Sequence, residues 1–171
     1  SESRFEAVVR RLELKVVSIK APEGCNLILG QSHFIKSIDD LHEAMVTAVP
    51  NPKFGVAFCE SSGPCLVRFS GTDEALRKFA ADTAFRLGCG HCFIVVMRDV
   101  YPLNVLSKIR SVSEVCSIFC ATANPVEVII AETDQGRAVL GVVDGYMSKG
   151  IETEKDIKER KEFLRKIGYK F

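Results

Sequence analysis

Apolar residues occur along the chain in short periodic segments that predict a mixture of strands and helices. Near-alternation at 12–19 predicts a strand with one solvent-facing side. Short apolar runs predict further strands at 25–29, 54–59, 66–69, 92–97, 115–120, 126–132 and 138–143. The run at 92–97 is almost wholly apolar, which is typical of a central strand buried on both faces. Helical spacing predicts four helices, which begin near Ser37, Thr72, Pro102 and Thr153.

Capping residues set the limits of the predicted helices. Ser37 is the predicted N-cap of the first helix, and Thr72 is that of the second. Gly88 stands where a C-terminal glycine is expected after the second helix. Thr153 and Asp156 have the spacing of a capping box at the start of the last helix.

The order of these elements predicts a single domain over 1–171. A turn at 134–136 predicts a hairpin between the last two strands. Strands and helices are mixed along the rest of the chain, without repeats or an interdomain linker. The predicted fold class is therefore α/β, with helices on both faces of a mixed sheet.

Composition and charge exclude several classes of partner. The 171 residues are 47% apolar and 26% charged, enough for a core without disulfides or metals. Lys and Arg number 23 against 22 Asp and Glu, which gives no electrostatic footprint for nucleic acid or an anionic membrane. No apolar run approaches the roughly 20 residues that cross a bilayer, and 1–11 has no signal-peptide stretch. We expect a cytoplasmic protein without nucleic-acid or membrane partners.

Two cysteine-based functions are possible on spacing alone. The tetrapeptide Cys-Gly-His-Cys at 89–92 has the dithiol spacing of disulfide oxidoreductases. In those proteins a helix N-terminus follows the motif and lowers the pKa of the first thiol, whereas here a helix ends at Gly88 and a strand follows. A zinc site would join these two cysteines to Cys116 and Cys120, which a straight strand holds about 13 Å apart. Buried structural thiols are the favoured interpretation, and redox catalysis is a less favoured alternative.

The chain lacks the motifs of the commonest nucleotide-binding and hydrolase sites. It has no Gly-x-x-x-x-Gly-Lys-Ser/Thr, no Gly-x-Gly-x-x-Gly at a helix start and no Gly-x-Ser-x-Gly. Polar residues instead gather at the ends of apolar strands, where open α/β sheets bind ligands. The substrate- or phosphate-binding candidates are Gln31, Ser32, Lys36, Glu60, Ser62, Gly63, Arg68, Asp99, Asn124 and Asp144.

The chemistry of these residue types suits phosphate. Backbone amides and hydroxyls can donate to phosphate oxygens, Lys36 and Arg68 add positive charge, and acids can hold Mg²⁺. His33 and His91 can act as a base or as a phosphoryl-accepting nucleophile. These two histidines are the candidate catalytic residues.

Six blocks in the same order resemble the adenosine-specific kinase family. They are GQSHFIK at 30–36, FGVAFCESSGP at 54–64, PLNVL at 102–106, ATANPVEV at 121–128, GVVDG at 141–145 and FLRKIGY at 163–169. The resemblance implies a three-layer α/β/α domain that assembles as a homo-oligomer, expected to be a trimer. It also implies binding of adenosine or AMP, and a histidine able to carry a stable phosphoryl group. Both His33 and His91 match the family pattern, and the choice between them stays open.

The resulting hypothesis is a phosphotransferase that uses ATP, with Mg²⁺ as a possible cofactor. A histidine would take the phosphoryl group and pass it to adenosine. Ser62, Gly63 and Arg68 would hold the phosphate with Lys36 nearby, while an acid, Asp99 or Asp144, would hold Mg²⁺ or orient the hydroxyl. The alternative is a non-catalytic sensor that binds adenosine or AMP in the same pocket.

Overall fold

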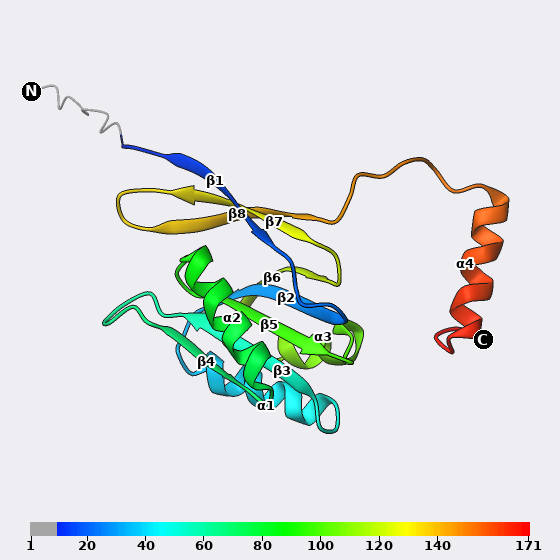
Figure 1. Ribbon diagram of the computed structural model, residues 1–171, viewed down its shortest axis with the longest axis horizontal. Coiled ribbons are helices and arrows are strands. Elements are labelled where there is room, and N and C mark those ends of the chain that lie inside the picture. The colour runs from blue at the N-terminus through cyan, green and yellow to red at the C-terminus, as the bar shows by residue number, and fades with distance from the viewer. Residues whose placement is uncertain (1–9) are drawn as a thin grey trace, which may run out of the picture.

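The structure is a computed structural model that describes residues 10–171 (Figure 1). Most of the N-terminal segment judged above for a signal peptide lies outside these residues. None of the described helices is long and apolar enough to cross a membrane. The elements are β1 (Glu13–Ile19), β2 (Cys25–Ser32), α1 (Ser37–Ala48), β3 (Lys53–Cys59), β4 (Val67–Gly71), α2 (Glu74–Leu87), β5 (Cys92–Arg98), α3 (Pro102–Arg110), β6 (Val115–Thr122), β7 (Val126–Glu132), β8 (Arg137–Asp144) and α4 (Glu154–Lys166).

The strands form two antiparallel sheets instead of the single mixed sheet that the sequence predicts. One sheet has five strands in the order β4-β3-β5-β2-β6, and the other has three in the order β1-β7-β8. Each crossover helix joins two strands that run in the same direction, but an antiparallel strand lies between them. Thus β5 separates β2 from β3, β3 separates β4 from β5, and β2 separates β5 from β6. Parallel strands therefore never become neighbours within residues 10–171, whereas the predicted mixed sheet would contain at least one parallel pair.

Helices cover both faces of the five-stranded sheet, which confirms the α/β class. On one face α1 and α3 bury a core that includes Met45, Phe58 and Phe93. On the other face α2 and the three-stranded sheet bury a second core, to which Leu76 and Val128 belong (Figure 1). The fold has three layers as expected, but one outer layer is part helix and part sheet.

The helix caps differ from the prediction at two of three N-termini. Ser37 is the first residue of α1, and its hydroxyl donates to the Phe34 carbonyl. Asp73, instead of Thr72, caps α2 by accepting from the Leu76 N–H at 3.0 Å. Thr72 is engaged elsewhere, because its hydroxyl donates to the Pro52 carbonyl. Either neighbour could cap by sequence, and the tertiary partner of Thr72 decides between them.

The other predicted helix ends are confirmed. Gly88 closes α2 in the left-handed conformation, with φ of 60°. Thr153 and Asp156 form the capping box of α4.

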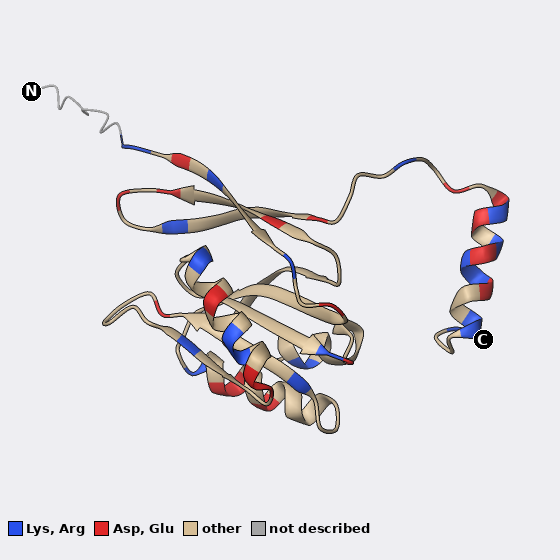
Figure 2. Ribbon diagram, viewed as in Figure 1, with Lys and Arg blue, Asp and Glu red and all other residues tan. Residues whose placement is uncertain are grey.

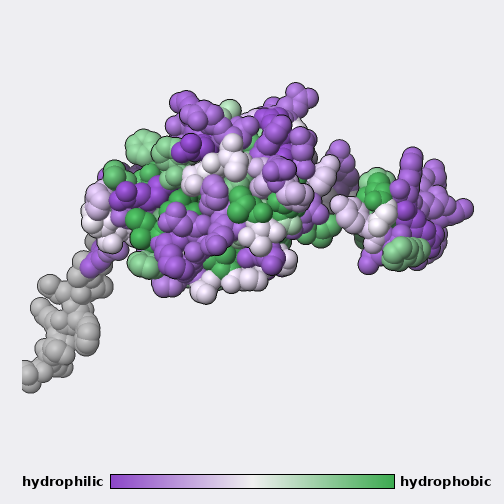
Figure 3. All heavy atoms as spheres, turned by 90° about the horizontal axis from the view of Figure 1, so that it is seen from below, coloured by the Kyte–Doolittle hydropathy of each residue, from purple (hydrophilic) through white to green (hydrophobic). Residues whose placement is uncertain are grey.

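The last helix stands apart from the rest of the molecule. After β8 the chain runs without regular structure over 145–153, and α4 then projects beyond the two sheets (Figure 1). No residue of α4 is buried against the described part of the chain. Its surface mixes both charge signs (Figure 2), and apolar atoms are also exposed on it (Figure 3). The exposed large apolar residues of α4 and the segments beside it are Tyr146, Met147, Ile151, Phe163, Ile167, Tyr169 and Phe171.

Candidate functional site

The polar residues predicted from strand ends meet at one end of the five-stranded sheet. Gln31 pairs with Cys92 and Ser32 with Val115, so the end of β2 lies beside the starts of β5 and β6. The Ser32 N–H donates to the His91 carbonyl at 2.9 Å. His33 directly follows Ser32, so the two candidate histidines belong to one cluster.

Backbone hydrogen bonds fix His91 in place. Its N–H donates to the Cys59 carbonyl at 2.8 Å, which connects it to the end of β3. Its ring stacks on that of Phe58, with centroids 5.6 Å apart and planes at 21°. The φ of His91 is 63°, a value that is uncommon for residues other than glycine. His91 therefore sits on a strained but well-anchored turn.

His33 lies beside a buried carboxylate that sequence reasoning missed. The His33 N–H donates to the Glu114 carbonyl at 3.0 Å. Glu114 is 5% exposed, and its Oε1 accepts from Lys36 Nζ at 3.2 Å. Hydrogen bonds to Asp40 and then Glu114 raise the pKa of Lys36, so this amine stays charged. Nothing in the residue pattern singles out Glu114, which is one acid in a short polar segment before β6.

Three buried polar atoms of this cluster have no hydrogen-bond partner within residues 10–171. They are the Oγ of Ser32, which is fully buried, the Oε2 of Glu114 and the Nε of Arg68. A buried polar group without a partner costs about 1–3 kcal/mol. A bound water or ligand at this end of the sheet would remove that cost.

Glu60 and Arg68 form an ion pair at the same end of the sheet. Glu60 accepts from the Leu66 N–H at 3.0 Å and from Arg68 Nη2 at 3.1 Å. The Leu66 N–H, together with Arg68, holds the pKa of Glu60 below its ordinary value. Ser62 and Gly63 are exposed in the adjoining β3–β4 loop, where Gly63 has φ of 61°. Glu60 directly follows Cys59, whose carbonyl accepts from His91, so this ion pair adjoins the histidine cluster, and Arg68 is already engaged by a carboxylate.

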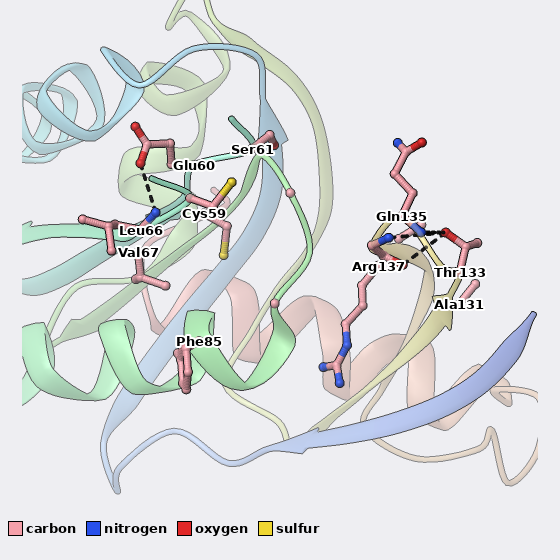
Figure 4. Close-up of a pocket in the computed structure, with 15 residues that line it drawn as sticks. Cys59, Glu60, Ser61, Leu66, Val67, Phe85, Ala131, Thr133, Gln135 and Arg137 are labelled. Carbon is pink, nitrogen blue, oxygen red and sulfur yellow. Dashed lines mark hydrogen bonds between the residues drawn. The ribbon is translucent and has the colours of Figure 1, made fainter. Parts of the chain in front are cut away.

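Two cavities open beside this ion pair. A cavity of about 510 Å³ lies between the β3–β4 loop, the end of α2 and the β7–β8 hairpin, with Glu60 and Ser61 on one side and Gln135 and Arg137 on the other (Figure 4). A second cavity of about 600 Å³ is lined by residues that include Lys36 and Arg68. Since Glu60 lines the first and Arg68 the second, their ion pair connects the two.

Three predicted residues lie at the opposite end of the sheet. Asp99 follows β5 and Asn124 follows β6, at the end where β2 begins. Asp144 ends β8 and pairs with Val126. The next residue, Gly145, lies against the side chain of Asn124. β2 runs from this end to the histidines, and at about 3.3 Å per residue it spans roughly 20 Å. The structure therefore does not bring these three residues into the histidine cluster.

Comparisons with known proteins identify the family. The model of the family described as adenosine specific kinase matches residues 17–170. The crystal structure of the PH1918 protein from Pyrococcus horikoshii OT3 is 46% identical, covers 94% of this chain and 99% of its own, and superposes with a TM-score of 0.91. No curated protein matches this chain. The resemblance found from the six sequence blocks is thus confirmed, and the chain belongs to the adenosine specific kinase family.

Proposed function

We propose that this protein transfers a phosphoryl group from ATP to adenosine through a phosphohistidine. The family supports adenosine as the acceptor. The observation that supports the proposal is the hydrogen bond from the Ser32 N–H to the His91 carbonyl, which joins the two backbone segments that carry His33 and His91. Two cations, Lys36 and Arg68, line one cavity beside the Glu60–Arg68 ion pair. A covalent carrier splits one difficult transfer into two easier displacements.

The histidine imidazole is the nucleophile of the first displacement and the leaving group of the second. In the first, a ring nitrogen attacks the γ-phosphorus, the bond to the β-phosphate oxygen breaks, ADP leaves and the ring gives up its N–H proton. In the second, the adenosine 5′-oxygen attacks the same phosphorus, the N–P bond breaks and AMP leaves. The ring regains a proton from the 5′-hydroxyl. Phosphoryl transfer of this kind needs alignment and charge more than covalent chemistry from the protein.

The surrounding residues would bind the transferred group. Lys36 and Arg68 offer charged donors, and the β3–β4 loop at Ser62 and Gly63 offers backbone N–H groups. Within residues 10–171 no group of three or more His, Cys, Asp or Glu could hold a metal ion alone. Mg²⁺ usually binds through one or two carboxylates together with substrate phosphates. The free Oε2 of Glu114 fits one such ligand, where Mg²⁺ would neutralise developing charge.

The test is the mass of the intact protein after incubation with ATP and Mg²⁺ at neutral or alkaline pH, with and without adenosine. We expect an acid-labile phosphoryl adduct that discharges to AMP when adenosine is added. His33→Asn and His91→Asn assign the carrier, since only one should abolish the adduct. His42→Asn is the control, because this ring lies on α1 and is hydrogen-bonded at 2.7 Å to Ser70 on β4. AMP formation that survives replacement of both His33 and His91 would refute the proposal.

One observation favours a second function, a nucleotide sensor without turnover. Both cations of the cluster are already paired, Arg68 with Glu60 and Lys36 with Asp40 and Glu114. Paired cations attract phosphate less strongly than free ones, which suits recognition of the nucleoside more than transfer. Adenosine binding without an adduct or AMP formation would select this function.

The exposed C-terminal helix supports assembly as a homo-oligomer, and we propose a trimer. Phe163, Ile167 and Tyr169 line a cavity of about 670 Å³ together with Tyr101, and all three side chains are exposed on the single chain. Contiguous exposed apolar surface commonly marks an interaction site. A second copy that covers α4 would bury these side chains.

A further inference from the structure

The tetrapeptide at 89–92 forms a tight turn that holds two thiols together. The Cys92 N–H donates to the Cys89 carbonyl at 3.2 Å, which closes a β-turn with Gly90 and His91 at its centre. The positive φ of His91 is the one that a type II turn requires at its second central residue. A β-turn keeps its outer Cα atoms within about 7 Å, and a disulfide spans about 4.4–6.8 Å between Cα atoms. The turn therefore has the dimensions of a disulfide.

The two thiols differ in character. The Cys89 thiol donates to the Leu87 carbonyl at 3.4 Å. The neighbouring Cys92 thiol and, after it, the Arg137 guanidinium lower the pKa of Cys89 below its ordinary value. The neighbouring Cys89 thiol and burial raise the pKa of Cys92. Cys89 is thus the thiolate-forming partner, and Cys92 is a neighbouring thiol that can resolve an oxidised Cys89.

We propose that Cys89 and Cys92 are a redox modification site, at which hydrogen peroxide forms a disulfide that shifts the turn carrying His91. The Cys89 thiolate attacks one peroxide oxygen, the O–O bond breaks, and Cys89 becomes a sulfenic acid as hydroxide leaves. The Cys92 sulfur then attacks the Cys89 sulfur, and the S–O bond breaks with loss of water. Overall two thiols lose two hydrogens and one peroxide becomes two waters. A dithiol reductant reverses the change.

The surroundings select a small oxidant. Cys89 and Cys92 are 1% and 4% exposed, so bulky disulfides do not reach them. The cavity of about 510 Å³ is lined by Gly88 and Gly90, which flank Cys89 and carry no side chains to block it. Hydrogen peroxide is small enough to approach from this cavity.

Disulfide formation would act on His91 because His91 lies inside the closed ring. A disulfide draws the two Cβ atoms to about 3.8 Å, and the intervening turn must adjust. His91 is held by hydrogen bonds on both sides, from Ser32 and to Cys59, and by its stacking on Phe58. A change in the turn therefore shifts the ring relative to the rest of the cluster. This site exists whether or not His91 carries a phosphoryl group.

The test uses the full chain with Cys65→Ser and Cys116→Ser, which removes its two exposed cysteines. Peroxide should remove the mass of two hydrogens, peptide mapping should link Cys89 to Cys92, and dithiothreitol should restore the original mass. Cys92→Ser should abolish the link and leave a sulfenic acid on Cys89 that dimedone traps. Cys25→Ser, a buried thiol at the far end of β2, should leave the link intact.

The chemical shifts of the histidine ring signals in NMR spectra report a change in the surroundings of His91. Its ring signals should move on oxidation, while those of His42, on α1, should not. If Cys89 and Cys92 stay reduced in native protein under peroxide that oxidises the unfolded chain, the site is refuted. If the disulfide forms and the His91 signals do not move, the coupling to His91 is refuted. Neither readout depends on phosphoryl transfer, so failure here is distinguishable from failure of the proposed function.

Discussion

Single glycines allow parts of this fold to approach closely. Gly55 on β3 lies directly under the start of α2, where an added Cβ would overlap the backbone carbonyl of Leu76. Gly90 lies against the side chain of Ser61, so the turn of His91 packs on the β3–β4 loop. A helix backbone cannot yield as a flexible side chain does. Gly55 thus sets the distance between α2 and the central sheet.

Replacing Gly55 by Ala should destabilise the protein strongly. The added methyl group must push α2 away from β3, and overpacking of this kind costs about 1–3 kcal/mol or more. The matched control is Gly141→Ala on β8, where an added Cβ meets nothing within 4 Å. That change should stay within about 0.5 kcal/mol of the parent. Urea unfolding of both variants makes the comparison, and equal stabilities would contradict the packing argument.

At the scale of elements, one carboxylate joins all three strands of the smaller sheet. Glu132, at the end of β7, accepts from Lys15 on β1 at 2.8 Å and from Arg137 on β8 at 2.7 Å. Arg137 also donates to the Arg86 and Leu87 carbonyls at the end of α2. This arrangement ties the sheet to α2 beside the candidate site. The hydrogen bonds from Lys15 and Arg137 lower the pKa of Glu132 to about 2.

Glu132→Gln should lower the thermal midpoint near neutral pH but not in strong acid. Because the pKa is lower in the folded than in the unfolded state, the carboxylate stabilises the fold above its ordinary pKa of 4.5. This contribution is lost as the pH falls towards about 2, where folded protein also becomes protonated. Thermal unfolding of parent and variant from pH 7 to pH 2 should show their difference shrinking. Glu127→Gln, an exposed position on the same strand, is the control, and an equal effect there would contradict the assignment.

At the scale of the whole molecule, the chain divides into a packed body and an exposed C-terminal helix. The two cores lie on the two faces of the five-stranded sheet. The helix α4 has local ion pairs such as Lys155–Glu159 and a capping box, yet buries no residue. Helices of this length are marginal by themselves in water, and tertiary packing normally supplies their stability. We propose that packing against another copy of the chain stabilises α4.

Phe163→Ser combined with Ile167→Ser should weaken self-association and change little else. Both side chains are exposed on one chain, so their loss should alter the unfolding free energy of an isolated chain by only about 0.5 kcal/mol. Sedimentation analysis should show that the trimer of the variant dissociates at a higher protein concentration than the trimer of the parent. Lys158→Ser, on the same helix, is the control. A parent that is monomeric, or a variant that associates as tightly as the parent, would contradict the proposal.

The sequence by itself determined the elements, the family and most of the candidate site. Apolar periodicity and turn residues are local properties, so all eight strands and four helices were predicted close to their observed ranges. His33, His91 and Arg68 were found because polar residues at strand ends are visible along the chain. The order of the strands in the sheet was not predicted, because between the two strands that each crossover helix joins lies a third strand from another part of the sequence.

Only the tertiary structure decided which strand ends meet. It separated Asp99, Asn124 and Asp144 from the histidines, since strands in antiparallel sheets end at both edges and residues at strand ends divide between them. It also added Glu114, whose burial arises from the packing of β6 against β2 and not from its neighbours in sequence. Secondary structure follows from interactions a few residues long, whereas a site is made by contacts between residues far apart in the chain.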